Sequence, residues 1–161
     1  MQPNTIMEPG TGVRARGYVQ PGQVLVSAEP MQITTILGSC VTVCMWDAGL
    51  GIGGANHFML PILAGPAGAS PRFGNVAMEE LLRKLAAAGA RRPFLKAHIF
   101  GGACMFDQMR TAGHLGEKNA AFAIDALRGY GIAVDQVDVG GARGRKVVFN
   151  TDEGTVWVKT I

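Results

Sequence analysis

The chain has 161 residues with a net charge of +3, and 48% of its residues are hydrophobic. This length and composition are typical of one compact domain, which would bury roughly 70% of the surface that its unfolded chain exposes. The mild charge and the lack of aromatic residues beside the basic clusters argue against nucleic-acid binding. We expect residues 1–10 to form a flexible tail and residues 11–161 to form the single domain.

The cysteines indicate free thiols, because their small and odd number, three, does not suit a disulfide framework. No charged-then-apolar leader of the secretory kind opens the chain, so we expect a cytoplasmic protein. Residues 48–71 carry no charge, but six glycines and three prolines interrupt them. A spanning helix would not be interrupted in this way, and we expect no membrane insertion.

In the first part of the chain, β-branched and alternating apolar residues predict five strands. The expected strands span residues 12–19, 23–28, 31–37, 41–46 and 51–60. The first two flank a turn at residues 20–22, and Pro61 stops the fifth. Small uncharged residues at 64–71 then predict a mobile surface flap.

The second part of the chain predicts two helices among further strands. Apolar residues spaced as on one helix face predict a helix over 76–88, with Asn75 as its N-cap and Gly89 at its end. A second helix is expected over 117–128, and strands over 94–100, 132–139, 146–150 and 155–161. This pattern indicates an α+β fold, a layered domain of mixed or antiparallel β-sheet packed with two main helices.

The candidate catalytic residues are a thiol and an imidazole. Cys40 comes directly after Gly38 and Ser39, and His57 lies in the next extended segment. A thiol attacks only as the thiolate, and with a pKa of ~8.5 it needs a neighbouring base at neutral pH. His57 is the candidate base, and the turn at Gly38 and Ser39 is the candidate source of backbone NH groups for an oxyanion. From the residues alone, each of these groups could also be a buried structural one.

Two other kinds of site are less consistent with the sequence. Residues 49–54 match the G-x-G-x-x-G pattern of dinucleotide-binding proteins, but no helix follows and the next acid is Glu79, so we interpret them as a tight turn. Cys40 and Cys44 lie four residues apart, ~13 Å in a strand, which is too far for one tetrahedral metal ion or a disulfide. We therefore expect no metal and no cofactor.

Five segments of the chain are similar to those of the CheD family of chemoreceptor glutamine deamidases. They are residues 37–44, 56–61, 99–103, 115–119 and 140–149. By position, the resemblance implies Cys40 as the nucleophile, His57 as the base and Thr34 as the third member, holding the imidazole. Neighbouring residues of a strand face opposite sides, so only one of Thr34 and Thr35 can face such a site.

The resemblance implies a hydrolase that uses a cysteine to convert glutamine side chains to glutamate on the cytoplasmic helices of bacterial or archaeal chemoreceptors. Cleavage of glutamate methyl esters would pass through a similar intermediate. A CheC-like phosphatase is a further partner that the family suggests. Two alternatives stay open: an interaction protein that binds a receptor or a CheC-like phosphatase with little catalysis, and a thiol amidase for small molecules.

Overall fold

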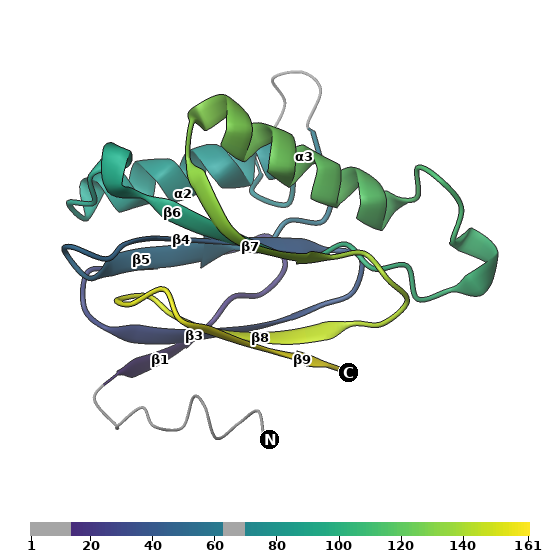
Figure 1. Ribbon diagram of the computed structural model, residues 1–161, viewed down its shortest axis with the longest axis horizontal. Helices are drawn as coiled ribbons and strands as arrows, with labels where there is room; N and C mark the ends of the chain where they lie inside the picture. Colours follow the sequence, from purple (N-terminus) through teal and green to yellow (C-terminus); the bar gives the residue numbers. More distant parts are fainter. Residues whose placement is uncertain (1–13, 63–69) are drawn as a thin grey trace.

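The computed structural model describes residues 14–62 and 70–161, and within them the chain forms three layers (Figure 1). Two α-helices, α2 (Gly74–Ala87) and α3 (Leu115–Tyr130), cover one face of a five-stranded sheet. A four-stranded sheet packs on its other face. The predicted α+β class is confirmed.

The five-stranded sheet has the order β2-β5-β4-β6-β7. Its strands are β2 (Val24–Ser27), β4 (Val41–Asp47), β5 (Ile52–Asn56), β6 (Lys96–Gly101) and β7 (Ala133–Val139). Its pairings are antiparallel except that β6 and β7 run parallel. The sheet is therefore mixed, which is one of the two forms that the sequence predicted.

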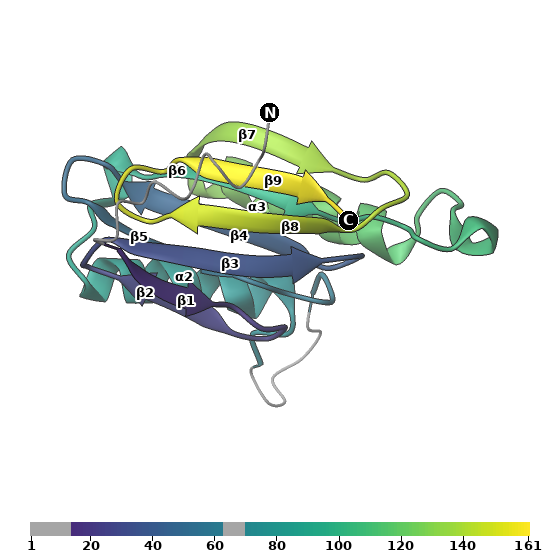
Figure 2. The same ribbon diagram turned by 90° about the horizontal axis from the view of Figure 1, so that it is seen from below.

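The four-stranded sheet has the order β1-β3-β8-β9 (Figure 2). Its strands are β1 (Ala15–Tyr18), β3 (Met31–Leu37), β8 (Arg145–Asn150) and β9 (Val156–Thr160). The strands expected on either side of residues 20–22 therefore lie in different sheets, because β1 pairs parallel with β3 whereas β2 pairs with β5.

Strand β4 lies at the centre of the molecule, and all of its residues are buried. Alternate residues of a strand face opposite sides of the sheet. Accordingly Val43 and Met45 belong to the hydrophobic cluster under the helices, whereas Cys44 and Trp46 belong to the cluster between the two sheets. This alternation decides which side chains of β4 lie under the helices and which lie between the two sheets.

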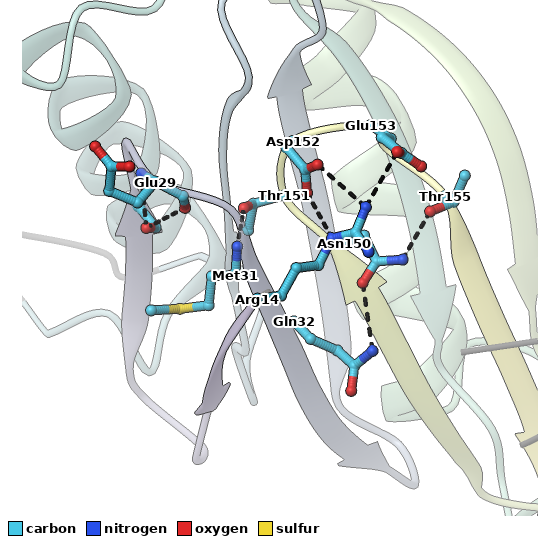
Figure 3. A network of polar contacts seen from close by, with 10 residues as sticks. Arg14, Glu29, Met31, Gln32, Asn150, Thr151, Asp152, Glu153 and Thr155 are labelled. Atoms are coloured by element: carbon cyan, nitrogen blue, oxygen red, sulfur yellow. Dashed lines mark hydrogen bonds and ion pairs between the residues drawn. The ribbon is translucent and has the colours of Figure 1, made fainter. Parts of the chain in front are cut away.

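Polar contacts tie β1 and β3 to the turn between β8 and β9 (Figure 3). The Arg14 guanidinium donates to the Asp152 carboxylate at 2.8 Å, and the backbone amide of Met31 donates to the Thr151 hydroxyl at 3.0 Å. In the same turn, the Asn150 amide donates to the Thr155 hydroxyl at 2.8 Å. The Met31 bond ties the start of β3 to this turn.

Some boundaries differ from those predicted. Helix α2 begins at Gly74 with Phe73 at the N-cap position, so Asn75 lies inside the helix and its prediction as the cap was wrong. The strand expected over 51–60 ends at Asn56, after which the chain makes one isolated bridge at Phe58. The predicted tail and most of the predicted flap lie outside the described residues.

Two short 3₁₀ helices span Arg92–Phe94 and Asp107–Met109. Of the helices in the part of the chain that the structure describes, none combines the length and apolar character needed to cross a membrane.

Candidate active site

The strand register brings Cys40 and His57 to the same face of the five-stranded sheet. Val41 pairs with Phe58 in an antiparallel bridge that continues the β4–β5 register, which sets Thr42 opposite His57. Cys40 is two residues before Thr42 and is therefore the diagonal neighbour of His57. Diagonal neighbours lie roughly 7–8 Å apart and remain within reach of long side chains. Both side chains face the four-stranded sheet.

Backbone contacts fix the turn before the nucleophile. The carbonyl of Gly38 accepts from Ala103 N at 3.0 Å, and the carbonyl of Cys40 accepts from Gly102 N at 2.9 Å. By contrast, the amide NH groups of Ser39 and Cys40 donate to no partner among the described residues. Free amides beside a partly buried thiol are the donors that an oxyanion requires.

A threonine of the four-stranded sheet contacts the imidazole, but it is Thr35 and not Thr34. The Thr35 hydroxyl lies 2.8 Å from His57 Nδ1. Ile33, Thr35 and Leu37 face the interior of the molecule, and Thr34 lies on the opposite face of β3 with the exposed Ile36. The prediction that Thr34 holds the His57 ring was therefore wrong, because the phase of the strand turns Thr34 away.

The contacts of Thr35 determine the tautomer of His57. Its hydroxyl proton is donated to the carbonyl of Val19 at 2.7 Å, so the hydroxyl oxygen is left to accept from Nδ1–H of the ring. Nε2 then carries the lone pair. That atom is buried and has no partner among the described residues. The ring is thus held with an unprotonated nitrogen ready to take a proton.

Burial keeps both candidate residues neutral in the resting state. Desolvation lowers the pKa of His57 to about 4, and the nearby Val19 carbonyl opposes this shift only in part. Desolvation also raises the pKa of the Cys40 thiol above its usual value. Both shifts favour a neutral thiol and a neutral imidazole at rest, in which deprotonation would accompany attack, over a preformed thiolate–imidazolium pair.

An apolar groove opens beside the nucleophile turn, with a volume of about 400 Å³. Ser39 forms one part of its lining, and Cys104 lies within it. Four large apolar side chains at this groove are at least 40% exposed: Met105, Phe106, Met109 and Leu115. Exposed apolar side chains gathered in one place are typical of a surface that binds another molecule.

The other candidate residues have structural surroundings. Cys44 is completely buried, which raises the pKa of its thiol. Of residues 49–54, interpreted above as a tight turn, 49–51 belong to the turn before β5 and 52–54 to β5 itself, and no helix follows them directly. Among the described residues, no three His, Cys, Asp or Glu side chains gather as metal ligands would. Arg145 is buried, where it donates to the carbonyl of Gly101 at 3.2 Å.

Comparisons with known proteins identify the family of the chain. The family model described as CheD chemotactic sensory transduction matches residues 59–160. A protein of Anaeromyxobacter dehalogenans named "Probable chemoreceptor glutamine deamidase CheD 1" is 46% identical over 153 residues, which cover 95% of this chain and 89% of that protein. The chain belongs to the CheD family.

A second CheD protein is similar to the same degree. The "Probable chemoreceptor glutamine deamidase CheD" of Trichlorobacter lovleyi is 46% identical over 86% of this chain and 86% of that protein. Among solved structures, a Neisseria meningitidis protein of family DUF152 has a TM-score of 0.45 and 11% identity over 84% of this chain and 67% of that chain.

Sequence reasoning missed two residues of this CheD site. One is Thr35, because the sequence left open which of Thr34 and Thr35 faces the site, with apolar residues on both sides of the strand. The other is Asn119, whose side chain donates to the carbonyls of Ser39 and Met59. The sequence offered no signal for Asn119 apart from its place in residues 115–119, one of the segments similar to the family.

Proposed function

We propose that this CheD family member hydrolyses glutamine side-chain amides on chemoreceptors, giving glutamate and ammonia, with Cys40 as nucleophile and His57 as base. The observation that carries the proposal is the unpartnered Nε2 of His57, held by Thr35 on the sheet face that it shares with Cys40. The names of the related proteins supply the substrate, since they describe chemoreceptor glutamine deamidases.

The proposed first half-reaction forms a thioester. Nε2 of His57 takes the thiol proton as Sγ of Cys40 attacks the carboxamide carbon of the glutamine. The negative charge that develops on the carboxamide oxygen is stabilised by the free amides of Ser39 and Cys40, where one such donor is typically worth ~3 kcal/mol. The imidazolium then gives its proton to the departing nitrogen, and ammonia leaves.

The second half-reaction releases glutamate. His57 takes a proton from water as the water oxygen attacks the thioester carbon, and the C–S bond breaks. The thiol is restored when the imidazolium returns its proton to Sγ. Thr35 stabilises the imidazolium through both half-reactions, although a neutral hydroxyl does so less than a carboxylate would. A methyl ester would follow the same steps with methanol as the leaving group.

The apolar groove beside Ser39 suits a protein substrate. An amphipathic receptor helix could lay its apolar side chains on Met105, Phe106 and Met109 and so bring a glutamine to Cys40. Such docking would explain selectivity for a receptor over free glutamine, which has no apolar side chains to place there. The small-molecule amidase is the less favoured alternative for this reason.

Further parts of the proposal rest on the family resemblance. We propose residues 11–161 as one deamidase domain that acts in the cytoplasm, where receptor helices carry the substrate glutamines. A CheC-like phosphatase is a second proposed partner. The alternative in which the protein only binds a receptor or this phosphatase is tested by the same experiment as the reaction.

The test is mass spectrometry of a chemoreceptor co-expressed with the protein. Conversion of a glutamine amide to the acid adds ~1 Da, and we expect this gain with the wild-type chain and its loss with Cys40→Ala. Cys44→Ala is the matched control, because its thiol is sealed inside and should leave conversion within threefold. Conversion by Cys40→Ala would refute the assignment. Receptor binding without conversion by the wild-type chain would favour the interaction protein.

A further inference from the structure

Asn119 lies in the second turn of α3 and reaches into the candidate active site. Its side chain is completely buried, and its Nδ2 donates to the carbonyl of Ser39 at 3.0 Å and to the carbonyl of Met59 at 3.0 Å. Ser39 directly precedes the nucleophile, and Met59 lies two residues after His57. One amide group therefore joins the two segments that carry the proposed catalytic pair.

The Asn119 amide lies where the segment of Ser39 and the segment of Met59 diverge. Val41 and Phe58 exchange both of their backbone hydrogen bonds. In a regular antiparallel ladder the next such pair would be Ser39 and Leu60. Instead the amides of Met59 and Leu60 turn away to the carbonyl of Arg72, at 2.8 and 3.1 Å. The amide of Asn119 occupies the resulting fork.

The fork explains why the amide of Ser39 is free. If the ladder continued, Ser39 N–H would donate to the carbonyl of Leu60. That carbonyl accepts from Gly74 N at 2.7 Å instead, and the carbonyl of Ser39 is satisfied by Asn119. Divergence of the segments thus keeps the NH groups of Ser39 and Cys40 available to a substrate oxygen.

Asn119 has the features of a group kept for position and not for stability. Its Oδ1 is buried with no partner among the described residues, which costs free energy. Exchanging the places of Oδ1 and Nδ2 would set an oxygen against two carbonyl oxygens, so the orientation is fixed. An apolar residue of the same shape would avoid the unsatisfied oxygen but could not hold the fork.

Helix α3 is held close enough for this contact by small residues at its start. A Cβ added at Gly116 would lie about 2.4 Å from the carbonyl oxygen of Gly102, so the helix approaches the chain after β6 only because both residues are glycines. The N-terminus is closed by His114 Nδ1, which accepts from Glu117 N at 3.1 Å. The close backbone approach of Gly116 to Gly102 therefore brings the Asn119 side chain within hydrogen-bond distance of Ser39 and Met59.

We propose that Asn119 is a positioning residue, which holds the fork between Ser39 and Met59 and so directs the free amides of Ser39 and Cys40 toward the substrate oxygen. This inference rests on the proposed function. It predicts that loss of the Asn119 amide slows the chemical step and leaves substrate binding at the exposed groove largely intact.

The test compares Asn119→Leu, which keeps the branched shape without the donors, with Leu127→Ala, which weakens the same helix far from the fork. For receptor deamidation by folded protein we expect Asn119→Leu to lower kcat about 100-fold, as loss of an oxyanion donor does, with KM within about threefold. Leu127→Ala, whose side chain is buried in the core under the helices, should keep kcat within threefold despite a lower Tm.

Asn119→Gln provides a second variant that retains the amide, and partial recovery of kcat relative to Asn119→Leu is expected. The inference is overturned if folded Asn119→Leu keeps kcat within threefold of the wild type, or if its loss matches that of Leu127→Ala at equal folded fraction. A wild-type chain without deamidase activity would instead refute the proposed function. In that case, an unchanged rate of Cys40 alkylation in Asn119→Leu would overturn this inference as well.

Discussion

Two neighbouring threonines have different surroundings, and the difference decides what holds the imidazole. Thr35 is 2% exposed and bonds to both Val19 and His57, whereas Thr34 lies on the other face of β3. The hydroxyl of Thr35 fixes the ring and would stabilise the imidazolium that forms during the reaction.

Exchange of these threonines for valine separates their roles. A hydrogen bond to a charged group contributes about 1.5–3 kcal/mol, so we expect Thr35→Val to lower kcat/KM by roughly 10- to 100-fold. Thr34→Val, at the matched position one residue away, should change kcat/KM by less than about threefold. Thr35→Ser should recover most of the activity. Equal losses in the two valine variants would contradict the assignment.

The neutral resting pair makes a prediction about thiol reactivity. Because burial raises the pKa of Cys40, its alkylation by iodoacetamide should still be rising with pH between pH 7 and 9, with a midpoint above that of an unstructured cysteine peptide measured alongside. The rate is read from the mass of the peptide that contains Cys40, which separates it from Cys44 and Cys104. A rate that is already constant below pH 7 would indicate a thiolate–imidazolium pair and contradict the resting state described above.

At the scale of elements, the site is formed where three of them meet. Strand β4 begins directly after the nucleophile turn, β3 supplies Thr35 from the facing sheet, and α3 supplies Asn119 from the opposite layer. Gly101 of β6, at φ +117°, permits the close approach of β6 to the nucleophile turn, since a side chain there would collide with the carbonyl of Cys40. Thr35 and Asn119 thus reach the site from opposite layers, and the spacing between the layers sets their distances from it.

The segment between β6 and α3 forms the exposed wall of the groove, and its effect on binding can be measured. Phe106 is 63% exposed, so its truncation should cost little stability. If a receptor helix docks there, Phe106→Ser should raise KM for receptor deamidation about 10-fold or more with kcat within about threefold. Leu50→Ser, at an exposed apolar residue in the turn before β5, is the control and should leave both constants unchanged. An unchanged KM in Phe106→Ser would refute docking at this wall.

At the scale of the whole molecule, two buried histidines connect stability to pH. Burial lowers the pKa of His57 from 6.5 to about 4, and burial also lowers that of His98, whose Nε2 lies 2.7 Å from the carbonyl of Gly154. Between the folded and unfolded pKa values the unfolded chain binds more protons. Stability is therefore complete above pH 6.5 and falls as the pH falls through this window.

Unfolding by urea at a series of pH values tests this linkage. The shift of His57 alone corresponds to about 3 kcal/mol, lost progressively between pH 6.5 and about 4. His57→Gln should show a smaller slope over the same window. The Arg91 guanidinium lowers the pKa of Asp47 to about 2, so protonation of Asp47 reduces the stability only below pH 3.8. That pH range lies outside the one over which the two slopes are compared. Equal slopes in the wild type and His57→Gln would contradict the buried neutral state.

The sequence by itself determined most of the elements, the α+β class and the candidate pair. Strand periodicity, glycine turns and one apolar helix face depend on local residues, and the segments around Cys40 and His57 carried the family resemblance. The pattern Ile33-Thr34-Thr35-Ile36-Leu37 did not settle the face of each threonine, because apolar residues lie on both sides of the strand.

Only the tertiary structure decided that Thr35 faces His57, that β1 and β2 join different sheets, and that Asn119 spans the fork beside Ser39. Asn119 lies 80 residues from Ser39 along the chain, and Thr35 lies 22 residues from His57. Contacts of this kind depend on how sheets and helices stack, and stacking is set by burial summed over the whole chain. No local pattern of residues contains that information.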